Sequence, residues 1–124
     1  MYKLGARSLE RLEGVHPDLV AVVNLAIQKT EIDFAVLEGL RTKERQVQLV
    51  ASGASRTMNS RHLTGHAVDL APLPIDWTNR EAFRAVANTM KAAAKEIGIG
   101  IEWGGDFKSF SDMPHFQLTV STHP

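Results

Sequence analysis

Residues 60–69 place two imidazoles and one carboxylate in a single short stretch, in a chain that contains no cysteine. The stretch reads Ser-Arg-His-Leu-Thr-Gly-His-Ala-Val-Asp. Histidine and aspartate are the side chains that hold zinc in sites without sulfur ligands. A second cluster, Asp112-Met113-Pro114-His115, lies near the C-terminus. Alone, a histidine and an aspartate at this spacing are usually a surface or capping feature. A metal site therefore requires a fold that brings both clusters together.

Alternating polar and apolar residues predict that each cluster borders or occupies a strand. In the segments 66–71 and 115–120, one face carries the apolar side chains Val68, Leu70, Phe116, Leu118 and Val120. The opposite face carries Ala67, Asp69, His115 and Gln117. Asp69 and His115 are therefore expected to point away from the core.

Helical spacing and capping signals predict four helices. They span 8–13 with Ser8 as cap, 17–30 beginning at Pro17, 42–52 with Thr42 as cap, and 78–97 with a Thr78 capping box and Gly98 as stop. On the third helix, we expect Val47 and Val50 to face inward. On the fourth helix, the expected buried stripe is Phe83, Val86, Ala87, Met90, Ala94 and Ile97.

Two further strands are expected at 33–40, with Phe34, Val36 and Glu38 on one face, and at 99–103. Residues 53–65 read as a long loop, and loops of this length are often functional. The order of elements predicts an α+β fold, in which helices pack on one face of a small antiparallel sheet. The metal site is then expected on the opposite face.

Length and charge narrow the possible partners. A chain of 124 residues suggests one domain, residues 1–124. Lysine plus arginine equal aspartate plus glutamate at 14 each, which argues against a nucleic-acid partner. No apolar run approaches the roughly 20 residues of a membrane span, and residues 1–7 lack the apolar core of a signal peptide. We expect a monomer with no membrane partner.

A catalytic zinc takes three protein ligands and leaves one position for water. His62, Asp69 and His115 can supply these three ligands. The small side chain of Ala67 leaves room on the Asp69 face, and Gly65 allows a sharp backbone turn after His62. The sequence therefore predicts one catalytic Zn2+.

His62 and His66 also match the spacing of a pair of zinc ligands on a helix. However, Thr64-Gly65 is a poor helical sequence, and Leu63 stands where that motif needs glutamate. We therefore expect His66 to face away from the metal.

Three further residues have both a functional and a structural interpretation. Asp112, three residues before His115, is placed to act as a general base, or it simply forms a turn before Met-Pro. Arg41, at a strand end, can bind a carbonyl oxygen that gains charge, or form a salt bridge with Glu38 or Glu44. Trp103, beside two glycines, can line a cleft or fill the core.

The spacing Ser60-x-His62-x-x-Gly65-x-Ala67-x-Asp69, followed by Asp112-x-x-His115, resembles zinc peptidases grouped with D-alanyl-D-alanine carboxypeptidases, vancomycin-resistance D,D-dipeptidases and hedgehog domains. Single-domain phage endolysins of the L-alanyl-D-glutamate endopeptidase type look most similar. The resemblance covers nearly the whole chain and includes the segments 8–19, 38–46 and 103–107. It implies a single zinc peptidase domain without a separate cell-wall-binding domain.

The resemblance implies His62, Asp69 and His115 as zinc ligands and Asp112 as the catalytic acid and base. It implies Arg41 as a contact of the substrate and the transition state. We place Ser60, Gln46 and Trp103 beside Arg41 as substrate-binding residues. Many relatives carry glutamate as the base, whereas aspartate stands here, as in some endolysins.

The function that the resemblance implies is zinc-dependent cleavage of the L-Ala–D-Glu bond in peptidoglycan stem peptides, causing host lysis. Two alternatives stay open: a D-Ala-D-Ala carboxypeptidase on the same scaffold, and a silent zinc-stabilised binding module. The implied route is synthesis in the host cytoplasm, release through a phage-made membrane hole and action on the wall in the periplasm.

Overall fold

The computed structural model describes residues 2–55, 57–108 and 111–124. Its helices are α1 (Ala6–Arg11), α2 (Pro17–Lys29), α3 (Lys43–Ala51) and α4 (Arg80–Ile97), with short 3₁₀ helices η1 (Arg61–Thr64) and η2 (Gly104–Asp106). Its strands are β1 (Phe34–Glu38), β2 (Ala67–Pro72), β3 (Ile101–Trp103) and β4 (His115–Leu118). Within these residues, no helix is both long and apolar enough to cross a membrane.

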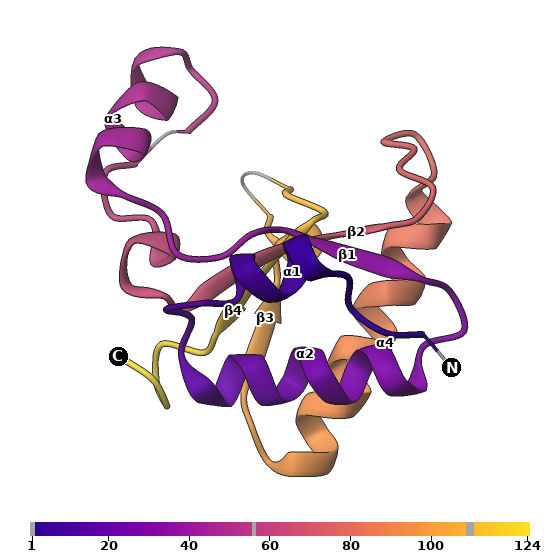
Figure 1. Ribbon diagram of the computed structural model, residues 1–124. Coiled ribbons are helices and arrows are strands. Elements are labelled where there is room, and N and C mark those ends of the chain that lie inside the picture. The colour runs from indigo at the N-terminus through magenta and orange to yellow at the C-terminus, as the bar shows by residue number, and fades with distance from the viewer. Residues whose placement is uncertain (1, 56, 109–110) are drawn as a thin grey trace.

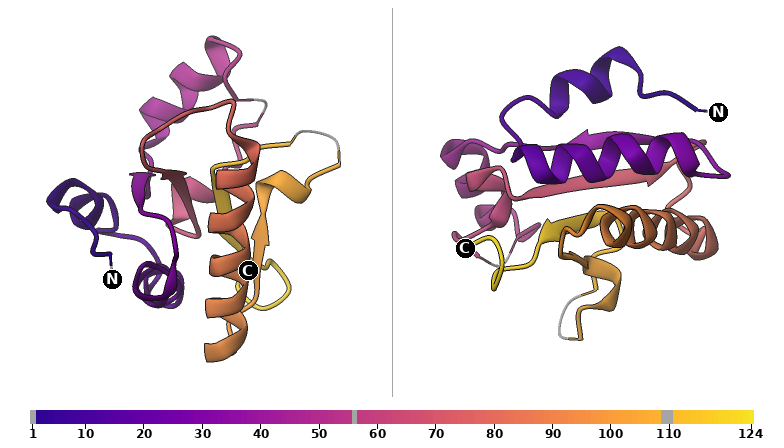
Figure 2. Two further views of the ribbon diagram at one scale, coloured as in Figure 1. Left: turned by 90° about the vertical axis from the view of Figure 1, so that its right-hand side faces the viewer. Right: turned by 90° about the horizontal axis from the view of Figure 1, so that it is seen from below.

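The four strands form one sheet in the order β1-β2-β4-β3, and every neighbouring pair is antiparallel. Helices α2 and α4 lie next to each other against one face of this sheet (Figure 2). Helix α1 runs along the edge strand β1. The predicted α+β fold, with helices on one face of a small antiparallel sheet, is confirmed.

The core lies between the sheet and the helix pair, as strand alternation predicted. Its sheet side is lined by Val36, Val68, Leu70, Phe116 and Leu118, each at most 1% exposed. Burial of each such side chain contributes on the order of 1.5–3 kcal/mol before entropic costs. Val120 was expected on this face, but it is 53% exposed because β4 ends at Leu118 and the chain turns away.

Helix α4 carries the expected buried stripe from Phe83 to Ala94 and ends at Gly98, whose φ of 72° is the left-handed conformation that glycine favours. Gly98 stops the helix as predicted, but the prediction was wrong for the cap residue and for Ile97. Asn79 rather than Thr78 is the cap, because the Asn79 side chain accepts from the Ala82 N–H. Ile97 is 41% exposed in the last turn.

Helix α1 begins at Ala6, so Ser8 is not its cap. The Ser8 hydroxyl is buried, and its oxygen accepts a hydrogen bond of 2.9 Å from the Val36 N–H. This bond ties α1 to β1 at the edge of the sheet.

Helix α3 stands clear of the sheet, as Figure 1 shows. Thr42 caps it as predicted, since its side chain accepts from the Arg45 N–H. Val47 does not face a core: it is 49% exposed, and Gln46 is the buried residue of the helix. The expectation was wrong for Val47, and Val50 is only partly buried, because a helix that projects from the sheet has no apolar layer to cover.

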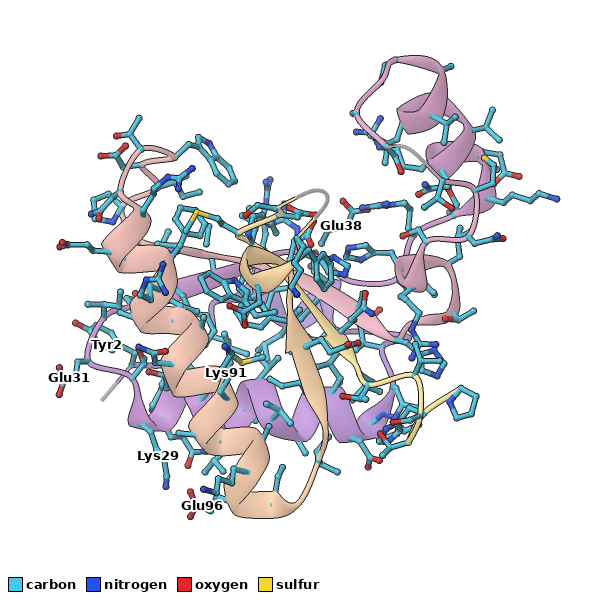
Figure 3. All side chains as sticks on the ribbon, turned by 180° about the vertical axis from the view of Figure 1, so that it is seen from behind. Tyr2, Lys29, Glu31, Glu38, Lys91 and Glu96 are labelled. Carbon is cyan, nitrogen blue, oxygen red and sulfur yellow. The ribbon has the colours of Figure 1, made fainter. Side chains whose placement is uncertain are left out.

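A β-bulge changes the direction of the last residue of β1. Val36 pairs with Leu70, but the next pair joins Glu38 to Asp69, so one residue of β1 is passed over. A bulge of this kind turns the following side chains to the other face. Glu38 therefore shares the face of Asp69 rather than that of Val36, at the end of the sheet from which α3 projects (Figure 3).

Candidate metal centre

Three side chains from different elements meet on the face of the sheet opposite the helices. His62 comes from η1, Asp69 from β2 and His115 from β4, and one ligand atom of each lies within 4.8 Å of the others. The distance from Asp69 Oδ1 is 3.1 Å to His62 Nε2 and 3.3 Å to His115 Nδ1. The structure thus brings together the three residues that the sequence singled out.

Backbone pairing and a tight turn bring these three side chains together. Asp69 and His115 are directly paired across β2 and β4, so their side chains share one face. His62 follows Ser60, whose hydroxyl oxygen caps η1 by accepting from the His62 N–H. Gly65 ends η1 with a φ of 75°, and a Cβ there would lie 2.4 Å from the Gly14 oxygen. Only glycine allows this turn so close to the neighbouring loop.

Hydrogen bonds hold each imidazole so that one nitrogen faces Asp69. His62 Nδ1 lies 2.9 Å from the Gly39 carbonyl oxygen, to which it donates, leaving Nε2 toward the carboxylate. His115 Nε2 lies 2.8 Å from Gln117 Oε1, leaving Nδ1 toward the carboxylate. Histidines that bind a metal are typically held in this way through the other ring nitrogen.

The spacing of these atoms fits a tetrahedral zinc site. Zinc binds imidazole nitrogen and carboxylate oxygen at about 2.0–2.1 Å, so two ligands of a tetrahedron lie about 3.3 Å apart. The observed separations from Asp69 to the two histidines are 3.1 and 3.3 Å. Two nitrogens and one oxygen are also the donor set that catalytic zinc sites use.

The charges of Asp69 and His115 depend on the hydrogen bonds that these side chains make. Burial alone would raise the pKa of Asp69, but hydrogen bonds from His115 and His62 outweigh it and hold that pKa far below its ordinary value. Burial likewise opposes charge on His115, yet the bonds to Asp69 and Gln117 raise the pKa of that ring. Without metal, the group is therefore stabilised as a carboxylate beside a protonated imidazole.

Metal-free protein is expected to lose stability as the pH rises above the ordinary histidine pKa of 6.5, whereas zinc-loaded protein should gain stability. The raised pKa of His115 lies above its ordinary value of 6.5, so its contribution is complete below that value and disappears as the pH passes the folded-state pKa. Zinc instead requires neutral imidazoles. Urea unfolding with and without zinc measures both trends, and parallel trends would contradict this assignment.

Asp112 lies beside the group without belonging to it. Its N–H donates to the Gly104 oxygen at 2.9 Å, and its own carbonyl accepts from the His115 N–H at 3.1 Å. A Cβ on Gly104 would lie 2.1 Å from the Asp112 oxygen, so the turn needs glycine there. Burial and the charge of Asp69 raise the pKa of Asp112, although His115, His62 and Arg41 oppose this shift. A carboxyl group of raised pKa beside a candidate metal is suited to proton transfer.

Arg41 is held by three side chains around its guanidinium group. It pairs with Glu38 through Nε, while Nη1 donates to Gln46 Oε1 at 2.7 Å and to Ser60 Oγ at 3.4 Å. Its N–H also donates to the His62 oxygen at 2.9 Å, which ties the arginine to the turn that carries His62. The sequence had named Glu38 as one partner that Arg41 could pair with, but it did not place Glu38 in the cleft because the bulge was not visible in the strand pattern.

A cleft of about 590 Å³ opens over the group. Its lining includes Glu38, Arg41, Ser60, His62, Asp69, Phe107, Asp112, His115 and Gln117. The cleft is large enough for a short peptide, since small-molecule sites typically occupy about 300–1,000 Å³.

Two residues expected in the substrate site lie elsewhere. Trp103 is 3% exposed in the core, and its indole N–H donates to the Met113 oxygen. Gln46 is fully buried beneath the cleft, where its amide nitrogen binds Ser55 Oγ and the Thr57 oxygen. Gln46 therefore supports Arg41 and the following loop, while the aromatic residue of the cleft is Phe107. No pattern in the sequence separates Phe107 from Trp103 as a residue of the cleft.

A second group, His16, Asp18 and His123, also places its donor atoms within 4.8 Å of one another. Three of its ring nitrogens already have partners: His16 Nδ1 caps α2 by accepting from the Asp18 N–H, and the two nitrogens of His123 contact Thr122 Oγ1 and Asp18 Oδ2. We assign this group the structural role of joining the chain end to α2. His66 lies outside both groups, with Nδ1 against Thr64.

The chain is similar in sequence and in structure to known peptidases. A family model described as phage L-alanyl-D-glutamate peptidase matches residues 1–120. The L-alanyl-D-glutamate peptidase of Escherichia phage T5 is 36% identical over 128 residues, which cover 98% of this chain and 93% of that protein. The crystal structure of the Serratia marcescens L-Ala D-Glu endopeptidase ChiX matches with a TM-score of 0.91 and 46% identity, covering 98% of this chain and 94% of that chain.

A vancomycin-resistance D,D-dipeptidase, solved with a D-Ala-D-Ala phosphinate analog, shares the fold alone. Its TM-score is 0.56 at 17% identity, covering 84% of this chain and 50% of that chain. The phage and Serratia proteins, by contrast, match across nearly their whole length. The chain belongs to the phage L-alanyl-D-glutamate peptidase family.

Proposed function

We propose that this chain is a zinc-dependent endopeptidase that cleaves the L-Ala–D-Glu bond of peptidoglycan stem peptides. The observation that carries the chemistry is the meeting of His62, Asp69 and His115 below a cleft that Asp112 and Arg41 also line. The choice of the L-Ala–D-Glu bond rests on two similar proteins, an L-alanyl-D-glutamate peptidase and an L-Ala D-Glu endopeptidase.

His62, Asp69 and His115 would hold the ion through Nε2, a carboxylate oxygen and Nδ1. A zinc ion there supplies Lewis acidity, which lowers the pKa of water toward about 7 and polarises a carbonyl group. Asp112 takes a proton from the attacking water as the water oxygen bonds to the L-Ala carbonyl carbon. Asp112 then donates that proton to the D-Glu nitrogen as the amide bond breaks.

Arg41 offers positive charge to the carbonyl oxygen as that oxygen becomes negative. Its pairing with Glu38 and its bond to Gln46 keep the guanidinium group in place before substrate arrives. Such preorganisation avoids the cost of orienting the charge during the reaction. Ser60, which contacts Arg41 and lines the cleft, is placed beside the bound peptide.

Muropeptide analysis by mass spectrometry tests the proposal. Purified wall incubated with the protein should release peptides that begin with D-Glu and leave L-Ala on the lactyl side, and a chelator should prevent both. Release of free D-Ala instead would identify a D,D-carboxypeptidase on the same scaffold. Zinc binding without any cleavage would identify a silent module and overturn the assignment.

The expected site of action is the cell wall, with peptidoglycan stem peptide as partner. Synthesis in the host cytoplasm, release through a phage-made hole in the membrane and action in the periplasm complete the proposed route. The protein is proposed to act as a monomer.

A further inference from the structure

His115 can bind a metal through Nδ1 only if its proton sits on Nε2. Nε2 lies 2.8 Å from Gln117 Oε1. A glutamine amide presents either an acceptor oxygen or a donor nitrogen to its neighbour. The direction of the Gln117 amide therefore decides which nitrogen of His115 keeps its lone pair.

Glu102 fixes that direction. Gln117 Nε2 donates to Glu102 Oε2 at 3.2 Å. A carboxylate accepts hydrogen bonds and does not donate them, so the amide nitrogen must face Glu102. The amide oxygen is then turned toward His115, whose Nε2 must be the donor, and Nδ1 is left free toward Asp69.

The register of the sheet builds this chain of contacts. Glu102 and Gln117 are directly paired between β3 and β4, as Asp69 and His115 are between β2 and β4. His115 and Gln117 are two residues apart on one strand and so share a face. The partner of Gln117 on β2 is Ala67, whose small side chain offers the amide no competing hydrogen bond.

We propose that Gln117 is a positioning residue for the metal ligand His115, and that Glu102 positions His115 at one remove by orienting the Gln117 amide. The inference rests on the proposed zinc chemistry. Neither residue belongs to the group of candidate ligands, and Glu102 is exposed on β3. Outer hydrogen-bond partners of metal-binding histidines typically change metal affinity by about 10–100-fold when they are removed.

Three variants test the His115–Gln117 and Gln117–Glu102 hydrogen bonds separately. Gln117→Leu removes the acceptor and should weaken zinc binding by about 10–100-fold. Gln117→Glu, made together with Glu102→Gln so that two carboxylates do not face each other, keeps an acceptor for Nε2–H and should bind zinc almost as tightly as wild type. Glu102→Gln lets the Gln117 amide reverse, so its effect should fall between these two. Glu96→Gln is the matched control, because Glu96 pairs with Lys29 at a distant surface (Figure 3).

The experiment is a competition titration of zinc with a chromophoric chelator, together with ¹⁵N NMR of the His115 ring in zinc-loaded protein. Wild type and the double variant should show zinc on Nδ1 and a proton on Nε2, while Gln117→Leu should bind weakly. Wild-type affinity in Gln117→Leu would overturn the role of Gln117, as would equal losses in the leucine variant and the double variant. Unchanged affinity and ring signals in Glu102→Gln would overturn the role of Glu102. A wild-type chain that takes up no zinc would instead contradict the proposed function itself.

Discussion

Replacing Asp112 by alanine is expected to abolish peptide hydrolysis while zinc stays bound. Asp112 lines the cleft but is not one of the three grouped ligands. Its loss removes the group that accepts the proton of water and returns it to the leaving nitrogen. General acid–base catalysis is typically worth about 10²–10⁴-fold, and a loss of that size in kcat/KM is expected. Asp112→Asn should lose as much, because the amide keeps the shape but cannot accept the proton.

Two controls define this result. His62→Ala should lose both zinc and activity, because it removes one of the three grouped donors. Asp106→Ala should keep both, since Asp106 pairs with Lys91 on the surface. Zinc content by elemental analysis and the release of new amino termini from purified wall give the two readouts. A fully lytic Asp112→Ala protein would exclude Asp112 as the base.

Removing zinc is the second change with a large expected effect. A chelator should abolish cleavage, and added zinc should restore it. Zinc that binds only the folded chain stabilises it by about 4 kcal/mol when its free concentration is 1,000 times the dissociation constant. The three donors come from η1, β2 and β4, so this stabilisation acts between separate parts of the chain. Thermal unfolding with and without zinc measures it.

Hydrogen exchange locates the effect of zinc removal. Asp69 and His115 are also joined by the β2–β4 pairing, whereas His62 stands on the short turn η1. The amides of residues 60–65 are therefore expected to lose the most protection in metal-free protein. Equal protection of this turn in the two forms would mean that His62 is held without the metal.

Strand period explains why much of the site was predictable from the sequence. A period of two placed Asp69 and His115 on the face opposite Val68 and Phe116, and antiparallel pairing then set them side by side. The capping signals at Thr42 and Pro17 also marked true helix starts. Strand alternation and helix capping depend on residues that are close together in the chain, so the sequence shows them directly.

The remaining features depend on contacts between distant segments. Trp103 faces the core rather than the cleft because it pairs with Phe116 of β4 on the core face, where its indole N–H donates to the Met113 oxygen. The exposure of Val47 follows from the direction in which α3 leaves the sheet, which its own spacing does not contain. The direction of the Gln117 amide depends on Glu102, a residue of another strand.

The bulge between Val36 and Glu38 has a consequence for how this family can vary in length. Deleting the passed-over residue, Leu37, would make the ladder regular and would leave Glu38 opposite Asp69, on the face of the cleft. Arg41 would then keep its carboxylate partner, and every core contact before the bulge would survive. The chain is therefore expected to tolerate a length change of one residue at the bulge without losing the Glu38–Arg41 pair.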